Sequence, residues 1–295
     1  MAPKHGDIAV VVPTIRPDSY KKFLCEWEDL FIEHEVTVIA VIDGDKPYVK
    51  YDDKEYHIED VMKDYSDVIY NKNDGVRNLG FAFVAKNILE IKYIISFDDD
   101  VYPMTGSDPI QEHIDALTVR VPTTWISTAS KYMRGFPYGV REESEAVMSH
   151  GVWRNVPDYD APTQLVNGSS DEGVEYYKGA IPKGIFYPHC AMNFAFKRKA
   201  LPYVYQAPMG YKVGLDRFAD IWMGIECKKD FDALNWAVVT GYSTIWHSRA
   251  SNVFDNLIKE AKGLKMNEEY GKDEYFDLFI KKRNRWKEYI NKLLV

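Results

Sequence analysis

Three consecutive carboxylates, Asp98, Asp99 and Asp100, offer the clearest chemistry in the sequence. They directly follow 93–97, a largely apolar and β-branched run that predicts a buried strand. Side chains two positions apart in an extended segment share a face, so Asp98 and Asp100 could hold a hard cation such as Mn²⁺ or Mg²⁺. Diphosphate oxygens would fill the open positions, as in a nucleotide-sugar transferase. For D-x-D by itself, an acidic turn after a strand is the simpler alternative.

The elements that must position these carboxylates begin with a βαβ pattern. The sequence predicts strands over 8–12 and 36–42, with a helix over 20–31 between them, capped at 18–19. The two strands of such a unit are parallel, so the loops that follow them open on one edge of the sheet. We expect a nucleoside to bind at that edge.

The loops of this unit hold polar side chains suited to a nucleoside. Thr14 and Arg16 follow the first strand and Asp43 follows the second. A carboxylate can accept a hydrogen bond from a base or a ribose hydroxyl, although Asp43 is also the usual residue for an Asp-Gly turn. Neither G-x-G-x-x-G nor G-x-x-x-x-G-K-[ST] occurs, so the sequence lacks the dinucleotide fingerprint and the P-loop.

Periodicity and turn residues predict the remaining elements. Arg77 falls in a loop or first helical turn near the acidic strand, where it would contact diphosphate or a carboxylate, with a surface arginine as an equal alternative. The loops 133–141 and 155–162 are irregular, and long ordered loops are uncommon unless they build a site. The predicted strands are 68–70, 93–97, 124–128, 147–153, 236–239 and 244–248, with two crossings of the core between 181 and 196; the predicted helices are 81–90, 109–119, 216–228, 253–264 and 273–294.

Length and composition limit the class of protein. At 295 residues we expect a single α/β domain with 253–295 as a C-terminal helical extension. A net charge of −8 argues against nucleic-acid binding. The three cysteines lack metal-ligand spacing, which fits a reducing compartment. Since no run of about 18 apolar residues occurs, we expect no integral membrane segment and a soluble, cytoplasmic protein.

Several longer motifs, taken together, resemble one family. The chain is similar to the reversibly glycosylated polypeptides, or UDP-arabinopyranose mutases, along nearly its whole length and in the family's order. The least ambiguous motif is Pro157-Asp158-Tyr159-Asp160-Ala161-Pro162-Thr163-Gln164-Leu165, which is too long and irregular for chance agreement. The other matching stretches are 12–16, 43–45, 98–100, 134–142, 149–151, 181–184, 192–196 and 245–248.

The resemblance implies a fold and a reaction. The fold would be the glycosyltransferase-A-like, Rossmann-like fold of nucleotide-diphospho-sugar transferases, with a mixed central sheet and C-terminal helices. The reaction would be the Mn²⁺- or Mg²⁺-dependent interconversion of UDP-arabinopyranose and UDP-arabinofuranose, with reversible self-glycosylation of an arginine that matches Arg134. The chain departs from the plant pattern at 219–224, where only Asp220 remains of a pair of aspartates. That departure leaves the identity of the sugar open, and another UDP-pentose or UDP-hexose is an alternative.

The resemblance also assigns roles to residues. Asp98, Asp100 and His247 would bind the metal, while Asp99 would turn into the fold or toward the ribose. Thr14, Arg16 and Asp43 would bind uridine, and Arg77 would bind diphosphate or hold Asp98. Lys183 and Asn193 would line the sugar pocket or order its loops.

Arg134 is a poor nucleophile, because a guanidinium keeps its proton at neutral pH. A carboxylate must therefore assist it, and Asp220 and Asp158 are the two candidates. Arg141 is the second arginine of the same loop. In one hypothesis Arg134 captures the pentosyl unit while the ring reopens and closes; in the other it only stabilises the departing phosphate.

Two other functions stay open at this point. The chain could be a UDP-sugar-dependent glycosyltransferase that acts on a separate acceptor. It could also be a self-glycosylated carrier or scaffold for polysaccharide synthesis. Whatever its function, the chain could form a homo- or hetero-oligomer. A carrier is labelled once per chain, whereas a mutase converts an excess of UDP-sugar.

Overall fold

The computed structural model describes residues 6–126, 132–249 and 251–294. Its strands are Ile8–Thr14 (β1), Thr37–Ile42 (β2), Tyr48–Tyr51 (β3), Lys54–His57 (β4), Tyr93–Phe97 (β5), Val101–Pro103 (β6), Arg120–Val121 (β7), Ser144–Arg154 (β8), Gly179–Ala180 (β9), Asn193–Lys197 (β10) and Trp236–His247 (β11). Its α-helices are Pro17–Glu33 (α1), Ile58–Met62 (α2), Arg77–Asn87 (α3), Pro109–Thr118 (α4), Ala161–Asn167 (α5), Ala219–Ala233 (α6), Val253–Glu268 (α7) and Glu274–Leu293 (α8).

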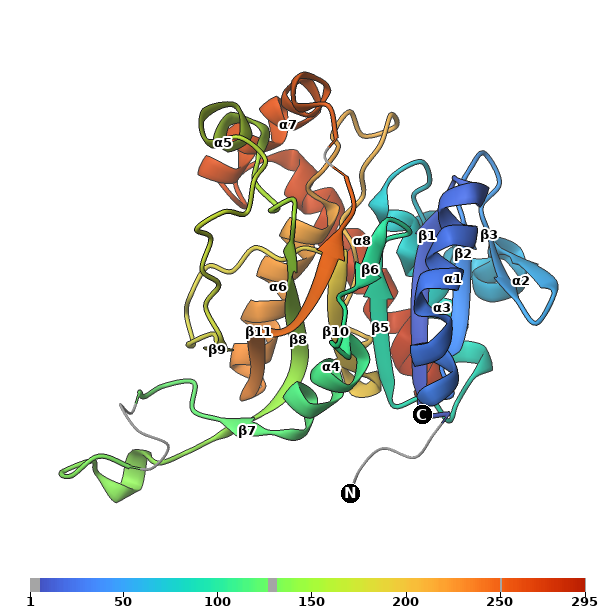
Figure 1. Ribbon diagram of the computed structural model, residues 1–295. Coiled ribbons are helices and arrows are strands. Elements are labelled where there is room, and N and C mark those ends of the chain that lie inside the picture. The colour runs from blue at the N-terminus through green and yellow to red at the C-terminus, as the bar shows by residue number, and fades with distance from the viewer. Residues whose placement is uncertain (1–5, 127–131, 250, 295) are drawn as a thin grey trace.

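One mixed sheet joins all of these strands (Figure 1). The strand order is β4-β3-β2-β1-β5-β10-β8-β11-β6, with β7 beside β8 and β9 beside β11. Strand β1 is parallel to β2 and β5, and β8 is parallel to β11. Strand β10 lies between β5 and β8 and is antiparallel to both, so β5 and β8 run in the same direction. Strands β1, β2, β5, β8 and β11 therefore all end at the same edge of the sheet.

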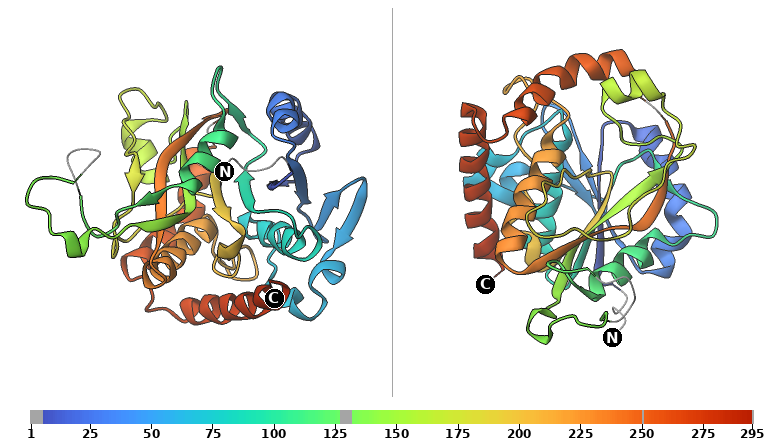
Figure 2. Two further views of the ribbon diagram at one scale, coloured as in Figure 1. Left: turned by 90° about the horizontal axis from the view of Figure 1, so that it is seen from below. Right: turned by 90° about the vertical axis from the view of Figure 1, so that its left-hand side faces the viewer.

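Helices cover both faces of the sheet (Figure 2). Successive side chains of β1 point to opposite faces, so Val10 lies in one core cluster with residues of α1 and α4, while Val11 lies in another with residues of α3, α6 and α8. A continuous apolar run is what a strand buried on both faces requires. The sequence prediction of an α/β fold with a mixed central sheet and C-terminal helices is confirmed.

Helix α3 packs closely on the sheet through Gly80. A Cβ atom at this position would lie 2.6 Å from Val11 Cγ1 and 2.7 Å from Val41 Cγ2. We expect Gly80→Ala to lower the free energy of unfolding by about 1 kcal/mol or more, because overpacking outweighs the helix propensity gained by alanine. Chemical denaturation measures this loss. Gly139→Ala, where a Cβ would meet nothing within 4 Å, is the matched control and should change stability much less.

Helix α8, in the predicted C-terminal helical extension, packs into the main core. Phe279, Trp286 and Ile290 are fully buried in the same cluster as α3 and α6. The Trp286 indole donates a hydrogen bond of 2.9 Å to the carbonyl of Leu201. The charged side chains of α8 lie on the outer side of the helix, where Lys282 and Arg285 pair with Asp67.

Several predicted elements differ from the structure. Residues 63–68 form a 3₁₀ helix where a strand over 68–70 was expected. The two C-terminal strands are one strand, β11, whose register with β8 shifts between Thr240 and Thr244. Of the two core crossings between 181 and 196, only β10 is a strand, since prolines at 182 and 188 have no N–H for a ladder. No strand forms over 124–126, and 127–128 lie outside the described residues.

The predicted start of α1 was also wrong. The helix begins at Pro17, with Arg16 as N-cap, and not after Asp18 and Ser19. A proline is well suited to the first helical position because its missing N–H would be unpaired there.

Candidate active site

The common strand-end edge gathers the residues that could do chemistry. Asp98, Asp99 and Asp100 follow β5, and we call this side of the sheet the acidic edge. Thr14 ends β1 and His247 ends β11 at the same edge. Ligand sites in open α/β sheets lie beyond the carboxyl ends of strands.

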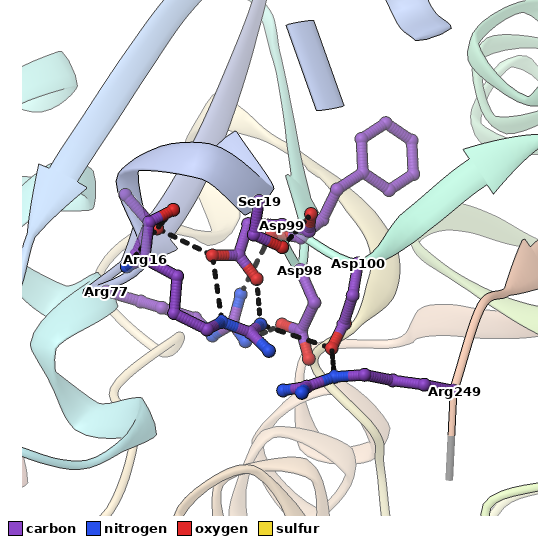
Figure 3. A network of polar contacts seen from close by, with 9 residues as sticks. Arg16, Ser19, Arg77, Asp98, Asp99, Asp100 and Arg249 are labelled. Atoms are coloured by element: carbon purple, nitrogen blue, oxygen red, sulfur yellow. Dashed lines mark hydrogen bonds and ion pairs between the residues drawn. The ribbon is translucent and has the colours of Figure 1, made fainter. Parts of the chain in front are cut away.

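Asp99 is turned into the fold. From the sequence we expected either this orientation or one toward the ribose. Its side chain is buried, and it accepts a 2.6 Å hydrogen bond from the Thr14 hydroxyl. The Arg16 guanidinium forms an ion pair with the same carboxylate (Figure 3). Ser19 of α1 donates to the Asp99 carbonyl at 3.1 Å. Asp99 therefore ties the β1 loop to the acidic run.

Asp98 is held by Arg77 from the first turn of α3. The two side chains form an ion pair, and Arg77 is only 2% exposed (Figure 3). Arg77 also donates to the Ser96 hydroxyl at 2.9 Å and to the Phe97 carbonyl at 3.3 Å. With these bonds Arg77 fixes the orientation of Asp98, which is one of the two roles expected for it.

Asp100 faces two further arginines. Its Oδ2 atom lies 3.1 Å from Arg16 Nη2 and 3.1 Å from Arg249 Nε (Figure 3). Burial raises the pKa of the Asp100 carboxyl, the charges of Asp98 and Asp99 add to the rise, and Arg16 and His247 oppose it. The Arg249 side chain is 61% exposed, so it can swing away without opening the core.

The donor set fits a hard cation only in part. Among the described residues, no three histidine, cysteine or acidic side chains gather closely enough to form a metal site, so Asp98, Asp100 and His247 do not make the compact triad that was expected. Two carboxylates suffice for Mg²⁺ when phosphates and waters complete its sphere. Arg16 and Arg249 supply positive charge at Asp100 in this arrangement. The His247 Nδ1 lies 3.1 Å from the Val156 carbonyl, which leaves Nε2 for a ligand.

Asp43 is a fixed carboxylate at the end of β2. Its Oδ1 accepts hydrogen bonds from the backbone N–H groups of Gly44 at 2.7 Å and Lys72 at 2.8 Å. Burial raises the pKa of this carboxyl, although the backbone bonds act in the opposite direction. These contacts make the Asp-Gly turn, and the backbone N–H of Asn73 also bonds this carboxylate.

A second set of carboxyl groups adjoins the acidic run. Asp74 and Asp158 both act electrostatically on Asp220, and Asp98 acts on both Asp74 and Asp158. Asp220 lies in the first turn of α6 and accepts a 2.9 Å bond from the Ala191 N–H. Protein atoms around its carboxyl raise the pKa of Asp220 to about 7, and the charges of Asp74 and Asp158 add to this effect.

The raised pKa of Asp220 predicts a pH dependence of stability. In the folded protein the Asp220 carboxyl stays protonated at pH values where the same carboxyl in the unfolded chain, with a pKa of 3.8, has lost its proton. The resulting stabilisation is full below pH 3.8 and is lost as the pH rises toward 7. Asp220→Asn removes this pH-dependent stabilisation. Urea titrations should therefore show the variant gaining stability relative to the parent protein as the pH rises from 3.8 toward 7. If the free energies of unfolding of the two proteins varied with pH in the same way, the raised pKa of Asp220 would be contradicted.

Asn193 is a core residue, which corrects its expected place in a sugar pocket. It is 0% exposed, and its amide donates 3.0 Å to the Val152 carbonyl. Its Oδ1 lies 2.8 Å from Nε2 of His113, which is also fully buried. Burial lowers the pKa of His113 to about 4, so the imidazole is neutral. A Cβ on Gly151 would lie 2.0 Å from the Asn193 amide nitrogen, so the side chain is tightly enclosed.

Comparison with known proteins identifies the family. A family model described as "Reversibly glycosylated polypeptide" matches residues 3–279. The chain belongs to the reversibly glycosylated polypeptide family. It is 35% identical to a probable UDP-arabinopyranose mutase 4 of Arabidopsis thaliana, over 91% of this chain and 77% of that protein. It is 33% identical to UDP-arabinopyranose mutase 3 of the same plant, over 89% of this chain and 76% of that protein.

Solved structures give a weaker comparison. A Drosophila β-1,4-galactosyltransferase 7 mutant, in a complex with manganese, UDP-Gal and xylobiose, aligns with a TM-score of 0.38 and 11% identity, over 84% of this chain and 72% of that one. At that score it contributes nothing to the account of the site. None of the helices in the described residues has the length and apolar character needed to cross a membrane.

The position of the arginine loop differs from the expectation that Asp158 or Asp220 assists Arg134. Arg134 and Arg141 precede β8, which runs parallel to β5 and so begins at the edge opposite the acidic one. The structure shows the loop projecting there (Figure 1). Within one chain, therefore, neither Asp158 nor Asp220 reaches Arg134, and the expected assistance is not present.

Lys183 lies at the opposite edge as well. Its amine donates 2.7 Å to the side chain of Asn235, next to the start of β11. It lines a cavity of about 500 Å³ with Trp125 and Tyr177. Lys183 therefore lies away from the acidic edge, where we expected it to line the sugar pocket or order its loops.

Sequence reasoning missed two residues of the acidic edge. Arg249 follows the matched stretch 245–248 by one position, and Asp74 sits in a turn recognised only by composition. Because Arg249 directly follows a stretch that matches the family, that stretch could have pointed to it. Nothing in the local sequence marked Asp74, because its carboxyl neighbours come from distant segments.

Proposed function

We propose that this protein is a UDP-sugar mutase that interconverts UDP-L-arabinopyranose and UDP-L-arabinofuranose. Family membership and the names of its relatives support a mutase. The observation that carries the proposal is the acidic edge, where Asp98 and Asp100 follow a central strand beside the loops of β1 and β2. A nucleotide diphosphate needs this combination of hydrogen-bonding loops and a centre that balances its charge.

In this proposal the first two strand-end loops bind uridine. Asp43, which backbone N–H groups hold in place, would accept a hydrogen bond from the base or the ribose. Thr14 and Arg16 shape the loop by holding Asp99. Arg16 is partly exposed and can turn a nitrogen toward a phosphate.

Asp98 and Asp100 would hold Mn²⁺ or Mg²⁺ together with phosphate oxygens and waters, and His247 would add Nε2 as a ligand only after its side chain moved toward them. The bound cation would neutralise negative charge on the departing uridine diphosphate. Arg77 keeps Asp98 in position, and Arg249 would have to leave Asp100 for a cation to be held there. In this proposal Asp158 and Asp220, which adjoin this region, would exchange protons with sugar hydroxyls.

Self-glycosylation on Arg134 remains part of the proposal, although the structure separates this arginine from its assisting carboxylates within one chain. Arg141 then serves to hold the loop. Arg134→Ala tests whether the modification is on the catalytic path. Full mutase turnover by that variant would discard an obligatory glycosyl-arginine.

The direct test is to incubate the purified protein with Mn²⁺ and an excess of UDP-arabinopyranose and to separate pyranose from furanose nucleotide sugars. We expect many turnovers per chain, without an added acceptor. Labelling that stops at one sugar per chain would favour a carrier, and a product that forms only with an acceptor would favour a glycosyltransferase. The three cysteines are free thiols, which fits the cytoplasmic location that we also propose.

A further inference from the structure

Arg217 lies at the acidic edge, directly before helix α6. Helix α6 leads into β11, which ends at the acidic edge, so the helix runs in the opposite direction and begins at that edge. Helices α5 and α7 follow the ends of β8 and β11 at the same end of the molecule, and they pack against each other (Figure 1). Arg217 is therefore a further arginine on the side of the sheet that holds Arg16, Arg77 and Arg249.

The backbone at Arg217 has a conformation that is unusual for an arginine. Its φ is 71°, in the left-handed region that residues with a Cβ rarely adopt. The segment around it is tied down, because Gly210 and Leu215 form a β-bridge and the Arg217 N–H donates 2.9 Å to Asp216 Oδ1. Such a conformation persists only where the surrounding structure holds it, and it is common at binding sites.

The Arg217 side chain is anchored to α7 and keeps donors for a ligand. Its Nη2 donates to the side-chain oxygen of Asn256, which is 6% exposed. Glu260 Oε1 lies 4.0 Å from Nε, which is too long for a hydrogen bond, and Glu260 Oε2 accepts a 2.7 Å bond from the Ala161 N–H. Nε is buried and has no hydrogen-bond partner among the described residues. A guanidinium has five N–H donors, so donors of Arg217 remain for a ligand.

The charge of Arg217 is also available. The carboxylates of 98–100 already pair with the other three arginines of this side. Burial raises the pKa of the Asp74 and Asp158 carboxyls, and the positive charge of Arg217 acts in the opposite direction on both. Its side chain is 34% exposed, so a ligand at the acidic edge can reach it.

We propose that Arg217 binds the terminal phosphate of uridine diphosphate. In the sheet, β5 lies between β1 and β8, so a nucleotide that starts at the loops of β1 and β2 and passes Asp98 ends near Asp158 and Arg217. The fork of a guanidinium matches two phosphate oxygens, and each hydrogen bond is strengthened by charge. The identity of the ligand rests on the proposed function, whereas the free donors and the charge of Arg217 do not.

Isothermal titration calorimetry with UDP and UMP, both in the presence of Mg²⁺, tests this role. We expect Arg217→Gln to weaken UDP binding about 10- to 100-fold, as the loss of a hydrogen bond to a charged group predicts. UMP lacks the terminal phosphate, so its affinity should change much less. Higher salt should weaken UDP binding to the parent protein more than to the variant, since screening acts on the charge that the variant lacks. Lys265→Gln, which removes an exposed charge in the last turn of α7, is the matched control and should bind UDP like the parent.

Arg217→Lys separates phosphate binding from support of the fold. It keeps the charge without the fork that contacts Asn256, so it should retain more UDP affinity than Arg217→Gln. UDP affinity of Arg217→Gln within about twofold of the parent, or equal losses for UDP and UMP in both variants, would overturn the role of Arg217. A parent protein that binds no UDP would overturn the proposed function as well. If the parent bound UDP through Arg217 but formed no furanose nucleotide sugar, only the proposed mutase activity would be refuted.

Discussion

Replacing Asp100 by Asn is expected to reduce UDP-sugar turnover about 100- to 1000-fold. The amide keeps the shape of the side chain and can still accept a hydrogen bond from Arg249, but it has no charge to offer a divalent cation. A Lewis-acid contribution of several kcal/mol corresponds to that factor, at tenfold for each 1.4 kcal/mol or so. Turnover at saturating Mn²⁺, together with Mn²⁺ binding followed by electron paramagnetic resonance, measures the effect.

The matched control for this variant is Asp53→Asn. Asp53 is exposed in the turn between β3 and β4, with a φ of 55° that asparagine adopts readily. This substitution makes the same chemical change away from the acidic edge, so turnover and Mn²⁺ binding should stay at the parent level. If Asp100→Asn retained both properties, the cation would have to bind elsewhere.

Replacing Arg77 by Met is expected to lower the free energy of unfolding by about 3 kcal/mol. Arg77 is almost completely buried, and its removal leaves the Asp98 carboxylate without its cation. Breaking one partner of a buried pair typically costs more than the pair contributed, because the remaining charge stays desolvated. Guanidinium chloride unfolding, monitored by circular dichroism, measures the change.

A double-mutant cycle isolates this pair. Asp98→Asn also leaves an unpaired buried charge, whereas the double variant Arg77→Met with Asp98→Asn leaves none. The double variant should therefore be more stable than the sum of the two single losses predicts. Simple additivity would mean that Arg77 acts by packing against its neighbours and not as the counter-charge of Asp98.

The sequence was a reliable guide where the pattern is local. The apolar runs of β1, β2 and β5 predicted their strands, because a strand covered on both faces must be continuously apolar. The three carboxylates could be placed at a strand end for the same reason. The burial of Asp99 was also within reach, since neighbouring side chains in a strand alternate between faces.

Other features depended on segments that are far apart in the chain. Asn193 looked like a pocket residue in a matched motif, but it lies fully buried between β8, β11 and α4. Strand β11 looked like two strands, because its register shift opposite β8 falls around Gly241. No local property of either stretch records which neighbour will pack against it.

By itself, then, the sequence determined the α/β class, the βαβ start, the strand-end position of Asp98, Asp99 and Asp100, and the family. Only the tertiary structure decided which arginine holds which carboxylate, and that Arg134 lies at the edge opposite Asp158 and Asp220. The physical reason is that the direction of β8 follows from the placement of antiparallel β10 between β5 and β8, a pairing of residues about 100 and 50 positions apart in the chain. Hydrophobic periodicity predicts that a strand forms and which faces it buries, but not the neighbour with which it pairs.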